Sequence, residues 1–155
     1  MKSNNFKKID GANLKLAIVR ARFNEEITHG LLDGSKRGCQ VSGVMSHDVM
    51  IIEVPGSFEI PLQVKRLAKQ KKFSAIIALG AIIKGETKHD EYIANAVIPA
   101  LMQIGLQYDV PVMLGIITPL NLEQAKARSA ADEHNVGYQA VLAAVEVCSI
   151  LDHKA

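Results

Sequence analysis

Short apolar runs alternate along the chain with longer segments of helical periodicity. The runs occupy residues 14–21, 49–54, 74–83 and 110–117. The third run is apolar at successive positions, which is typical of a parallel strand covered by helices on both faces of its sheet. Because each run is followed by a helical pattern, we predict an α/β fold: a four-stranded parallel sheet between two helical layers, a three-layer αβα arrangement.

The helical patterns predict helices at residues 27–43, 58–71, 88–107, 122–130 and 135–152. In the second of these, Phe58, Leu62 and Leu67 are spaced to line one side of the helix. Pro99 lies inside the third, where it removes a backbone donor and is expected to bend the helix. We expect a single domain over residues 1–155, with residues 1–13 forming a flexible N-terminal arm.

The composition narrows the class of protein. The 155 residues are 48% hydrophobic and 22% charged, which suits a globular domain of ordinary size. A net charge of +2, without a basic stripe interleaved with aromatic residues, argues against nucleic acid as a partner. No apolar stretch is long enough to span a membrane, and no secretory signal is visible. Because Cys39 and Cys148 also lack metal-ligand spacing, we expect a cytoplasmic protein without a metal site.

In open α/β sheets, ligands bind outside the carboxyl ends of the strands. The segments that follow the predicted strands should therefore gather at one edge of the sheet, which we call the carboxyl edge. These segments are residues 22–26, 54–59, 82–89 and 115–121. The sequence thus predicts that any chemistry lies at this edge.

The segment from Gly85 to His89 leads into the third predicted helix. A helix start presents unpaired N–H groups and a positive dipole end, and Gly85 and Thr87 beside it suit a bound phosphate. The same residues equally fit a plain capped helix, with Thr87 as the N-cap and Asp90 as its reciprocal partner. Spacing alone leaves both interpretations open.

His89 would lie in the first turn of that helix. An imidazole exchanges protons near physiological pH, so His89 is a candidate acid–base group, although a surface histidine fits the same pattern. His29, His47, His134 and His153 show no metal-ligand spacing, and we interpret them as surface residues.

Aromatic and charged side chains also fall at the predicted edge. Phe23 and Phe58 follow the first two strands, where their rings suit either stacking on a planar heterocycle or ordinary loop packing. Glu59 fits either a hydrogen-bond acceptor for ligand hydroxyls or a partner of the helix dipole. Arg128 fits either a bidentate phosphate contact or a solvated helix charge.

Four segments together resemble the 6,7-dimethyl-8-ribityllumazine synthase family in order and spacing. They are residues 21–34, 54–62, 78–97 and 115–129, and the most specific among them are VPGSFEIP and the G-x-T-x-H pattern that ends at His89. The resemblance implies a flavodoxin-like αβα domain. It also implies condensation of 5-amino-6-(D-ribitylamino)uracil with 3,4-dihydroxy-2-butanone 4-phosphate to a lumazine, phosphate and water, without a metal or organic cofactor.

The resemblance further implies a role for individual residues. His89 is expected to shuttle protons, Phe23 to stack on the pyrimidine, and Leu114 to reach the site of a neighbouring subunit. Residues 57–59 are expected to hold the ribityl chain and ring, and residues 81–83 to offer backbone contacts to the pyrimidine. Glu86, Thr87 and Arg128 are expected to surround the phosphate. The complete set of expected substrate-binding residues is Phe23, Ser57, Phe58, Glu59, Ala81, Ile82, Ile83, Glu86, Thr87, Leu114 and Arg128.

The resemblance implies a homopentamer with sites shared between neighbours. The short connection between the last two helices favours twelve pentamers closed into a 60-subunit shell. The chain departs from the family pattern at Val136, where a lysine is common, at Lys84, which replaces a frequent arginine, and at Glu86, which places an acid beside the phosphate. These departures support an alternative, a low-turnover flavin- or lumazine-binding paralogue or shell protein. The basic charge balance argues against a third possibility, an FMN electron carrier.

Overall fold

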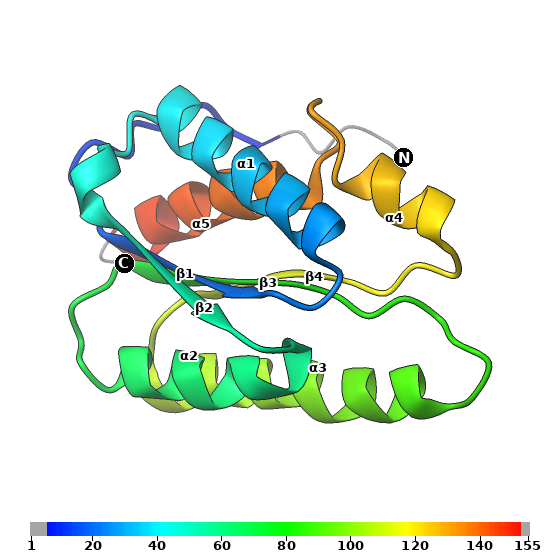
Figure 1. Ribbon diagram of the computed structural model, residues 1–155. Helices are drawn as coiled ribbons and strands as arrows, with labels where there is room; N and C mark the ends of the chain where they lie inside the picture. Colours follow the sequence, from blue (N-terminus) through cyan, green and yellow to red (C-terminus); the bar gives the residue numbers. More distant parts are fainter. Residues whose placement is uncertain (1–5, 153–155) are drawn as a thin grey trace.

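A four-stranded parallel sheet forms the centre of the protein. The computed structural model describes residues 6–152. Its strands are β1 (Leu16–Ala21), β2 (Val49–Val54), β3 (Ala75–Ala81) and β4 (Val112–Ile117), arranged in the order β2-β1-β3-β4 (Figure 1). The predicted parallel sheet is therefore confirmed, and β2 has the predicted bounds.

Helices cover both faces of the sheet. On one face lie α1 (Glu25–Ser42), α4 (Leu122–Arg128) and α5 (Val136–Asp152), and on the other lie α2 (Ile60–Ala68) and α3 (His89–Tyr108) (Figure 1). Each crossover carries a helix back across the sheet, as parallel pairing requires. The three-layer αβα arrangement is thereby confirmed.

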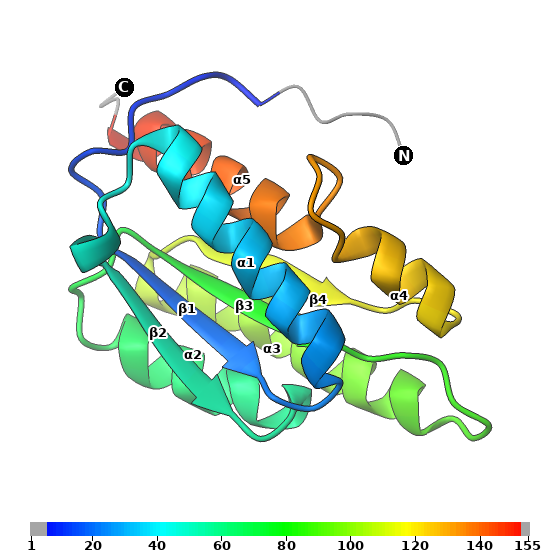
Figure 2. The same ribbon diagram turned by 45° about the horizontal axis from the view of Figure 1, so that its top comes forward.

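The strands finish level with one another at the carboxyl edge. Ala21 at the end of β1 is paired with Val54 at the end of β2. Ala81 at the end of β3 is paired in the same way with Ile117 at the end of β4. The loops that follow the strands therefore start from one line, and Figure 2 shows them leaving the sheet on the same side.

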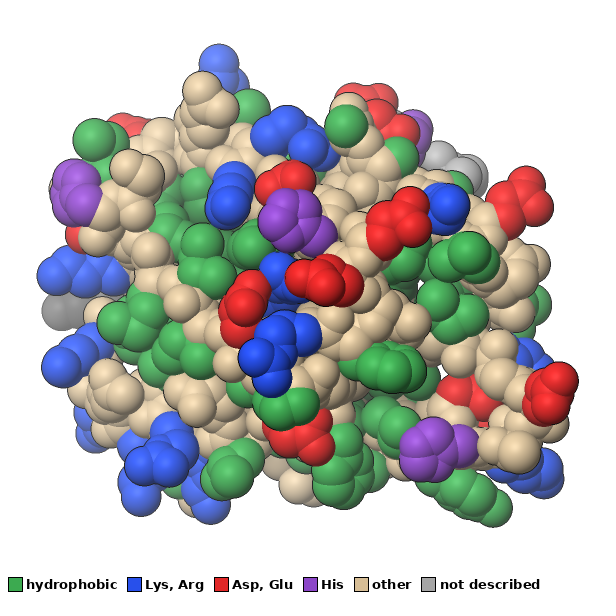
Figure 3. Space-filling model, in the orientation of Figure 1, with side chains coloured by type: hydrophobic (Ala, Val, Ile, Leu, Met, Phe, Trp, Pro, Cys, Tyr) green, Lys and Arg blue, Asp and Glu red, His purple; other side chains and the backbone are tan. Residues whose placement is uncertain are grey.

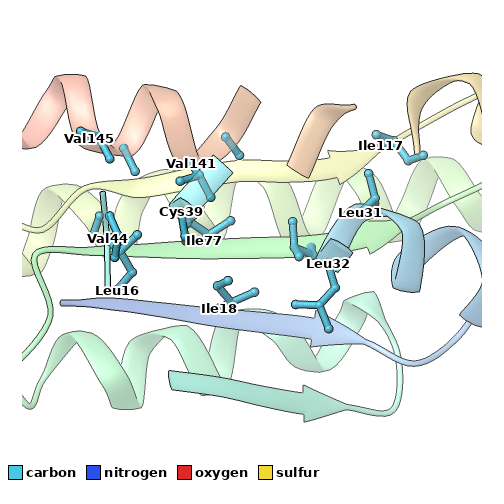
Figure 4. Close-up of a cluster of buried hydrophobic side chains, with 14 of the residues drawn as sticks. Leu16, Ile18, Leu31, Leu32, Cys39, Val44, Ile77, Ile117, Val141 and Val145 are labelled. Atoms are coloured by element: carbon cyan, nitrogen blue, oxygen red, sulfur yellow. The ribbon is translucent and has the colours of Figure 1, made fainter. Parts of the chain in front are cut away.

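The core consists of two apolar clusters, one on each face of the sheet. Leu16 and Ile18 of β1 pack in the cluster beneath α1 and α5, whereas Ala17 and Val19 pack in the cluster above α2 and α3. Figure 4 shows the first cluster, in which side chains of α1 and α5 meet those of the strands. All residues of β3 are buried, as predicted for a strand covered on both faces. Each fully buried aliphatic side chain contributes roughly 1.5–3 kcal/mol.

The buried face of α2 differs from the prediction. A 3₁₀ turn over Ser57–Glu59 precedes the helix, which starts at Ile60. Ile60, Val64 and Leu67 face the sheet, and Leu62 is 67% exposed. Residues two apart on a helix do not share a face, so the position of Ile60 turns Leu62 outward. Of the predicted apolar side, only Leu67 is buried.

The ends of the chain are described only in part. Residues 1–5 of the predicted arm and His153 lie outside the described residues. Gly11 is buried, and its N–H donates to the carbonyl of Ser42 over 2.7 Å. Lys7 N donates to the Glu146 carboxylate over 3.3 Å. The flexibility of the arm stays a prediction. Among residues 6–152, no helix is both long and apolar enough to cross a membrane.

Candidate active site

The loops after β1 and β2 continue the sheet beyond its strands. Arg22 N donates to the carbonyl of Val54 over 2.8 Å, and Phe23 N donates to the carbonyl of Pro55 over 3.0 Å. These bonds hold the segment 22–26 beside the segment 54–59. Two of the four predicted segments therefore meet at the carboxyl edge.

The loops after β3 and β4 are joined in the same way. Ile82 N donates to the carbonyl of Ile117 over 2.9 Å, and Lys84 N donates to the carbonyl of Pro119 over 3.0 Å. The two pairs of loops are linked by Asn24, whose side-chain Nδ2 donates to the carbonyl of Ala81 over 2.8 Å. All four segments thus form one continuous hydrogen-bonded surface.

The turn after β2 presents a hydroxyl, an aromatic ring and a carboxylate. Ser57 is nearly buried against Gly80 of β3, where an added Cβ would collide with its hydroxyl oxygen. Gly80 therefore allows this close approach, which holds Ser57 at the edge. Phe58 and Glu59 follow in the 3₁₀ turn with exposed side chains.

Large apolar side chains are uncovered at this edge. Phe23 is 71% exposed and Phe58 is 63% exposed, whereas Leu114, which is 48% exposed, lies within the outermost strand β4, opposite Ala78 of β3. The sequence left two interpretations open, stacking on a ligand and packing within the loops. The exposure of the two rings argues against packing within the loops. The rings are available to a ligand or to another protein surface.

Some backbone groups of the segment that follows β3 are already hydrogen-bonded within the chain. Ala81 and Ile82 are buried, and Ile83 is half-buried. The carbonyl of Ala81 accepts from Asn24, and the N–H of Ile82 donates to Ile117. A ligand contacting residues 81–83 would meet a segment whose position is set by these two bonds.

The start of α3 differs in detail from the predicted cap. Lys88, not Thr87, occupies the N-cap position, and its side chain makes no capping bond. Thr87 Oγ1 instead accepts from His89 N over 3.3 Å, and Asp90 Oδ1 accepts from Gly85 N over 3.4 Å. The predicted reciprocity between Thr87 and Asp90 was wrong, because a turn over residues 86–88 shifts the helix start by one position.

His89 is the first residue of α3, and its side chain is exposed, as are those of Glu86 and Thr87. Lys84 forms an ion pair of 3.8 Å with Glu91, and both side chains are about half exposed. Such a surface pair stabilises a fold by only about 0–1 kcal/mol. The helix start is therefore an open surface that carries an imidazole, a hydroxyl and a carboxylate.

Arg128 ends α4 on the opposite helical layer. Its side chain is half-buried and donates from one terminal nitrogen to the carbonyl of Gln124 over 3.3 Å. The helix is capped by Asn121, whose Oδ1 accepts from Gln124 N over 2.9 Å. Both α4 and the start of α3 project at the carboxyl edge, on either side of the sheet (Figure 1).

Asn135 ties the connection between α4 and α5 to α1. Its buried side chain donates to the carbonyls of Gly30 and Ala130 over 2.9 and 2.8 Å and accepts from Tyr138 N over 3.1 Å. Val136 is half-buried against the cluster beneath α1 and α5. An apolar side chain in the core therefore replaces the ammonium that the family resemblance leads one to expect there.

Sequence reasoning missed two polar features. Arg20 lies inside the apolar run of β1 and is 3% exposed, and it donates to Glu53 and to Thr28. Figure 3 shows acidic and basic side chains side by side in the middle of the face that is in view. Asn24 was the other omission. An asparagine between a strand and a helix tolerates a left-handed backbone, and that tolerance is the signal that could have identified it.

A cleft of about 540 Å³ lies at the opposite edge of the sheet, lined among others by Leu67, Phe73, Tyr108 and Pro111. None of the residues of the carboxyl edge borders it. Among the described residues, no group of three or more His, Cys, Asp or Glu is placed to hold a metal ion.

The layers, the strand order and the polar loops at the carboxyl edge define a flavodoxin-like α/β protein with its candidate site at the end of a parallel sheet. More narrowly, the chain belongs to the 6,7-dimethyl-8-ribityllumazine synthase family, whose model matches residues 13–152. Membership places it among transferases of riboflavin biosynthesis that form the lumazine.

Proposed function

We propose that the protein condenses 5-amino-6-(D-ribitylamino)uracil with 3,4-dihydroxy-2-butanone 4-phosphate to give 6,7-dimethyl-8-ribityllumazine, phosphate and water. The observation that carries the proposal is the bonding of all four family-like segments into one surface at the carboxyl edge. Family membership supports the reaction class.

The uracil would bind on the side of β1 and β2. Phe23 would stack on the pyrimidine, since its ring is 71% exposed. Ser57, Phe58 and Glu59 would hold the ribityl chain and ring from the turn after β2. Residues 81–83 would contact the pyrimidine through their backbone.

The butanone phosphate would bind at the start of α3. The first N–H groups of a helix and the positive end of its dipole favour an anion, and Thr87 adds a hydroxyl. Arg128 would neutralise the phosphate charge from the other layer. Glu86 would lie beside the phosphate, where its negative charge must be offset by these groups.

The reaction needs proton transfers but no redox step. The uracil amine attacks the ketone and loses water to form an imine, phosphate is eliminated, and the second amine closes the ring on the remaining carbonyl with loss of a second water. His89 would accept and return protons in these steps, since an imidazole does both near neutral pH. Holding two substrates in contact supplies much of the remaining acceleration.

The site would be completed by a second copy of the chain. We propose a homopentamer in which Leu114 of one subunit approaches the site of its neighbour, with a 60-subunit shell of twelve pentamers as the larger assembly. Phe23 and Leu114 are exposed in a single chain, which supports a neighbouring subunit that covers them. The short connection over residues 129–135 supports the shell.

The test is to mix the purified protein with both substrates and to follow lumazine absorbance. A rate above the uncatalysed background is expected, and a rate equal to background would overturn the proposal. Native mass measurement on the same sample counts the subunits, and a monomer would contradict the shared site.

One observation favours a second candidate function, a lumazine- or flavin-binding paralogue with little turnover. Val136 packs toward the core where an ammonium is expected, so one cationic group is missing from the site. Tight lumazine binding without turnover would favour this candidate.

A further inference from the structure

We propose that Asn24 is a positioning residue that sets the separation between the Phe23 loop and the segment that follows β3; we call the space between them the slot. The proposal rests on the proposed function, because it concerns the slot in which the pyrimidine would lie. Asn24 is not expected to touch the reacting atoms. It acts by holding two other segments at a set separation.

The conformation of Asn24 is unusual for its place in the fold. It occupies the N-cap position of α1 in the left-handed region, with φ 58° and ψ 52°, and its side chain makes no capping bond. An asparagine at this position ordinarily accepts from a free N–H of the first helical turn. The backbone carbonyl of Asn24 accepts from Ile27 N and Thr28 N, each over 3.0 Å, as at any helix start, but its side chain accepts no such bond. The side chain is therefore left for another partner.

That partner lies at the end of a different strand. Asn24 Nδ2 donates over 2.8 Å to the carbonyl of Ala81, 57 residues away. A carbonyl only accepts, so the nitrogen of the amide, not its oxygen, must face it. The side chain of Asn24 thus bonds to a distant strand and not to its own helix. Non-glycine residues with a left-handed backbone cluster at functional sites.

The bond matters for Phe23 because the described residues leave most of its ring uncovered. Phe23 is 71% exposed, so packing within the chain does not set its direction. Its own N–H is bonded to Pro55 on one side, and the next residue is bonded to Ala81 on the other. The two bonds anchor the loop to both neighbouring strands and thereby aim the ring.

The bond also fixes the opposite wall of the slot. The carbonyl of Ala81 is occupied by Asn24, and the N–H of Ile82 is occupied by Ile117. The segment 81–83 is thus held between β1 and β4. Loss of the Asn24 amide would release both walls at once and leave a carbonyl without its partner.

The first experiment compares Asn24→Gly and Asn24→Asp with the unchanged protein. Glycine keeps the left-handed backbone without the amide, and aspartate keeps the shape but places a carboxylate against the carbonyl. We expect the KM for the uracil substrate to rise about five- to tenfold in Asn24→Gly and at least as much in Asn24→Asp, the size of one lost hydrogen bond. The KM for the butanone phosphate should change less than about twofold, because no bond of Asn24 reaches its site.

Lys71 supplies the matched control. It also has a left-handed backbone, with φ 55°, but it lies before β3 at the opposite edge of the sheet. Lys71→Gly should leave both KM values unchanged. Unchanged KM values in both Asn24 variants, or an equal rise for both substrates, would overturn the proposal and assign Asn24 a purely structural role.

A binding measurement separates this proposal from the proposed function. If the unchanged protein shows no turnover, the proposed function fails, and lumazine binding by fluorescence titration still tests Asn24. Binding that is about five- to tenfold weaker in Asn24→Gly, with an unchanged thermal midpoint, supports the slot. Equal binding in the three proteins overturns it.

Discussion

Arg20 donates to Glu53 over 2.8 Å across β1 and β2, and its side chain is 3% exposed while that of Glu53 is 46% exposed. A second carboxylate, that of Glu25, lies 3.7 Å from the guanidinium. One terminal nitrogen of Arg20 is buried without a hydrogen-bond partner. The Arg20–Glu53 ion pair is therefore the main interaction that offsets the cost of burying the Arg20 cation.

The first prediction concerns this pair. Glu53→Gln should lower the free energy of unfolding by about 1–3 kcal/mol, because it leaves the buried guanidinium with weaker compensation. Urea denaturation measures the change. Glu26→Gln is the control, since Glu26 pairs with Lys126 over 3.4 Å on an exposed surface and should cost less than about 1 kcal/mol. Equal effects of the two changes would contradict the role of Arg20.

The second prediction concerns His89. His89→Ala should lower kcat by about 10²–10⁴-fold while it weakens substrate binding much less, because general acid–base catalysis contributes that much. The side chain is exposed, so the thermal midpoint should not change. His47→Ala is the control, because His47 is an exposed histidine in the turn before β2, away from the carboxyl edge. A kcat that is unaffected by His89→Ala would remove the imidazole from the mechanism.

The third prediction concerns Arg128. Arg128→Ala should mainly raise the KM for the butanone phosphate, by about tenfold or more, since a charge-assisted bond contributes about 1.5–3 kcal/mol. Arg128→Lys should recover part of the loss, because it restores the charge without the planar fork. Steady-state kinetics with each substrate varied in turn measure both effects. If the KM for the butanone phosphate is unchanged in Arg128→Ala, the phosphate group does not bind at Arg128.

The fourth prediction concerns the two cysteines. Burial raises the pKa of the Cys39 thiol from 9.0 to about 11, and burial together with the negative charge of Asp152 raises the pKa of Cys148 from 9.0 to about 11. The folded protein therefore holds these protons more tightly than the unfolded chain does. The resulting stability is fully present below about pH 9 and is lost as the pH rises toward about 11.

Urea unfolding across that pH range measures the effect. The midpoint should fall with rising pH, and it should fall less steeply in the double variant Cys39→Ala, Cys148→Ala, whatever the starting stability of that variant. Iodoacetamide should label both thiols slowly in the folded protein and rapidly in urea, because the thiolate is the reactive form. Rapid labelling of the native protein near neutral pH would show that the thiols are accessible and ionised.

The sequence predicted the layers correctly because parallel sheets require a local pattern. β3 is buried along its length and therefore appears as an unbroken apolar run, and β2 has the predicted bounds. The meeting of four loops at one edge followed from the same pattern, since parallel strands place all their carboxyl ends together. The roles of His89 and Arg128 stay predictions, because they depend on a bound substrate.

The sequence by itself determined the order and approximate positions of the strands and helices and which edge of the sheet is expected to carry the site, because burial on one or both faces leaves a periodic pattern in neighbouring residues. Only the tertiary structure decided that Arg20 is buried beside Glu53, that Leu62 faces outward and that Asn24 holds the end of β3. Those relationships join residues far apart in the chain or depend on how a turn sets the start of a helix. No local pattern of polar and apolar positions records the contacts of Arg20 and Asn24.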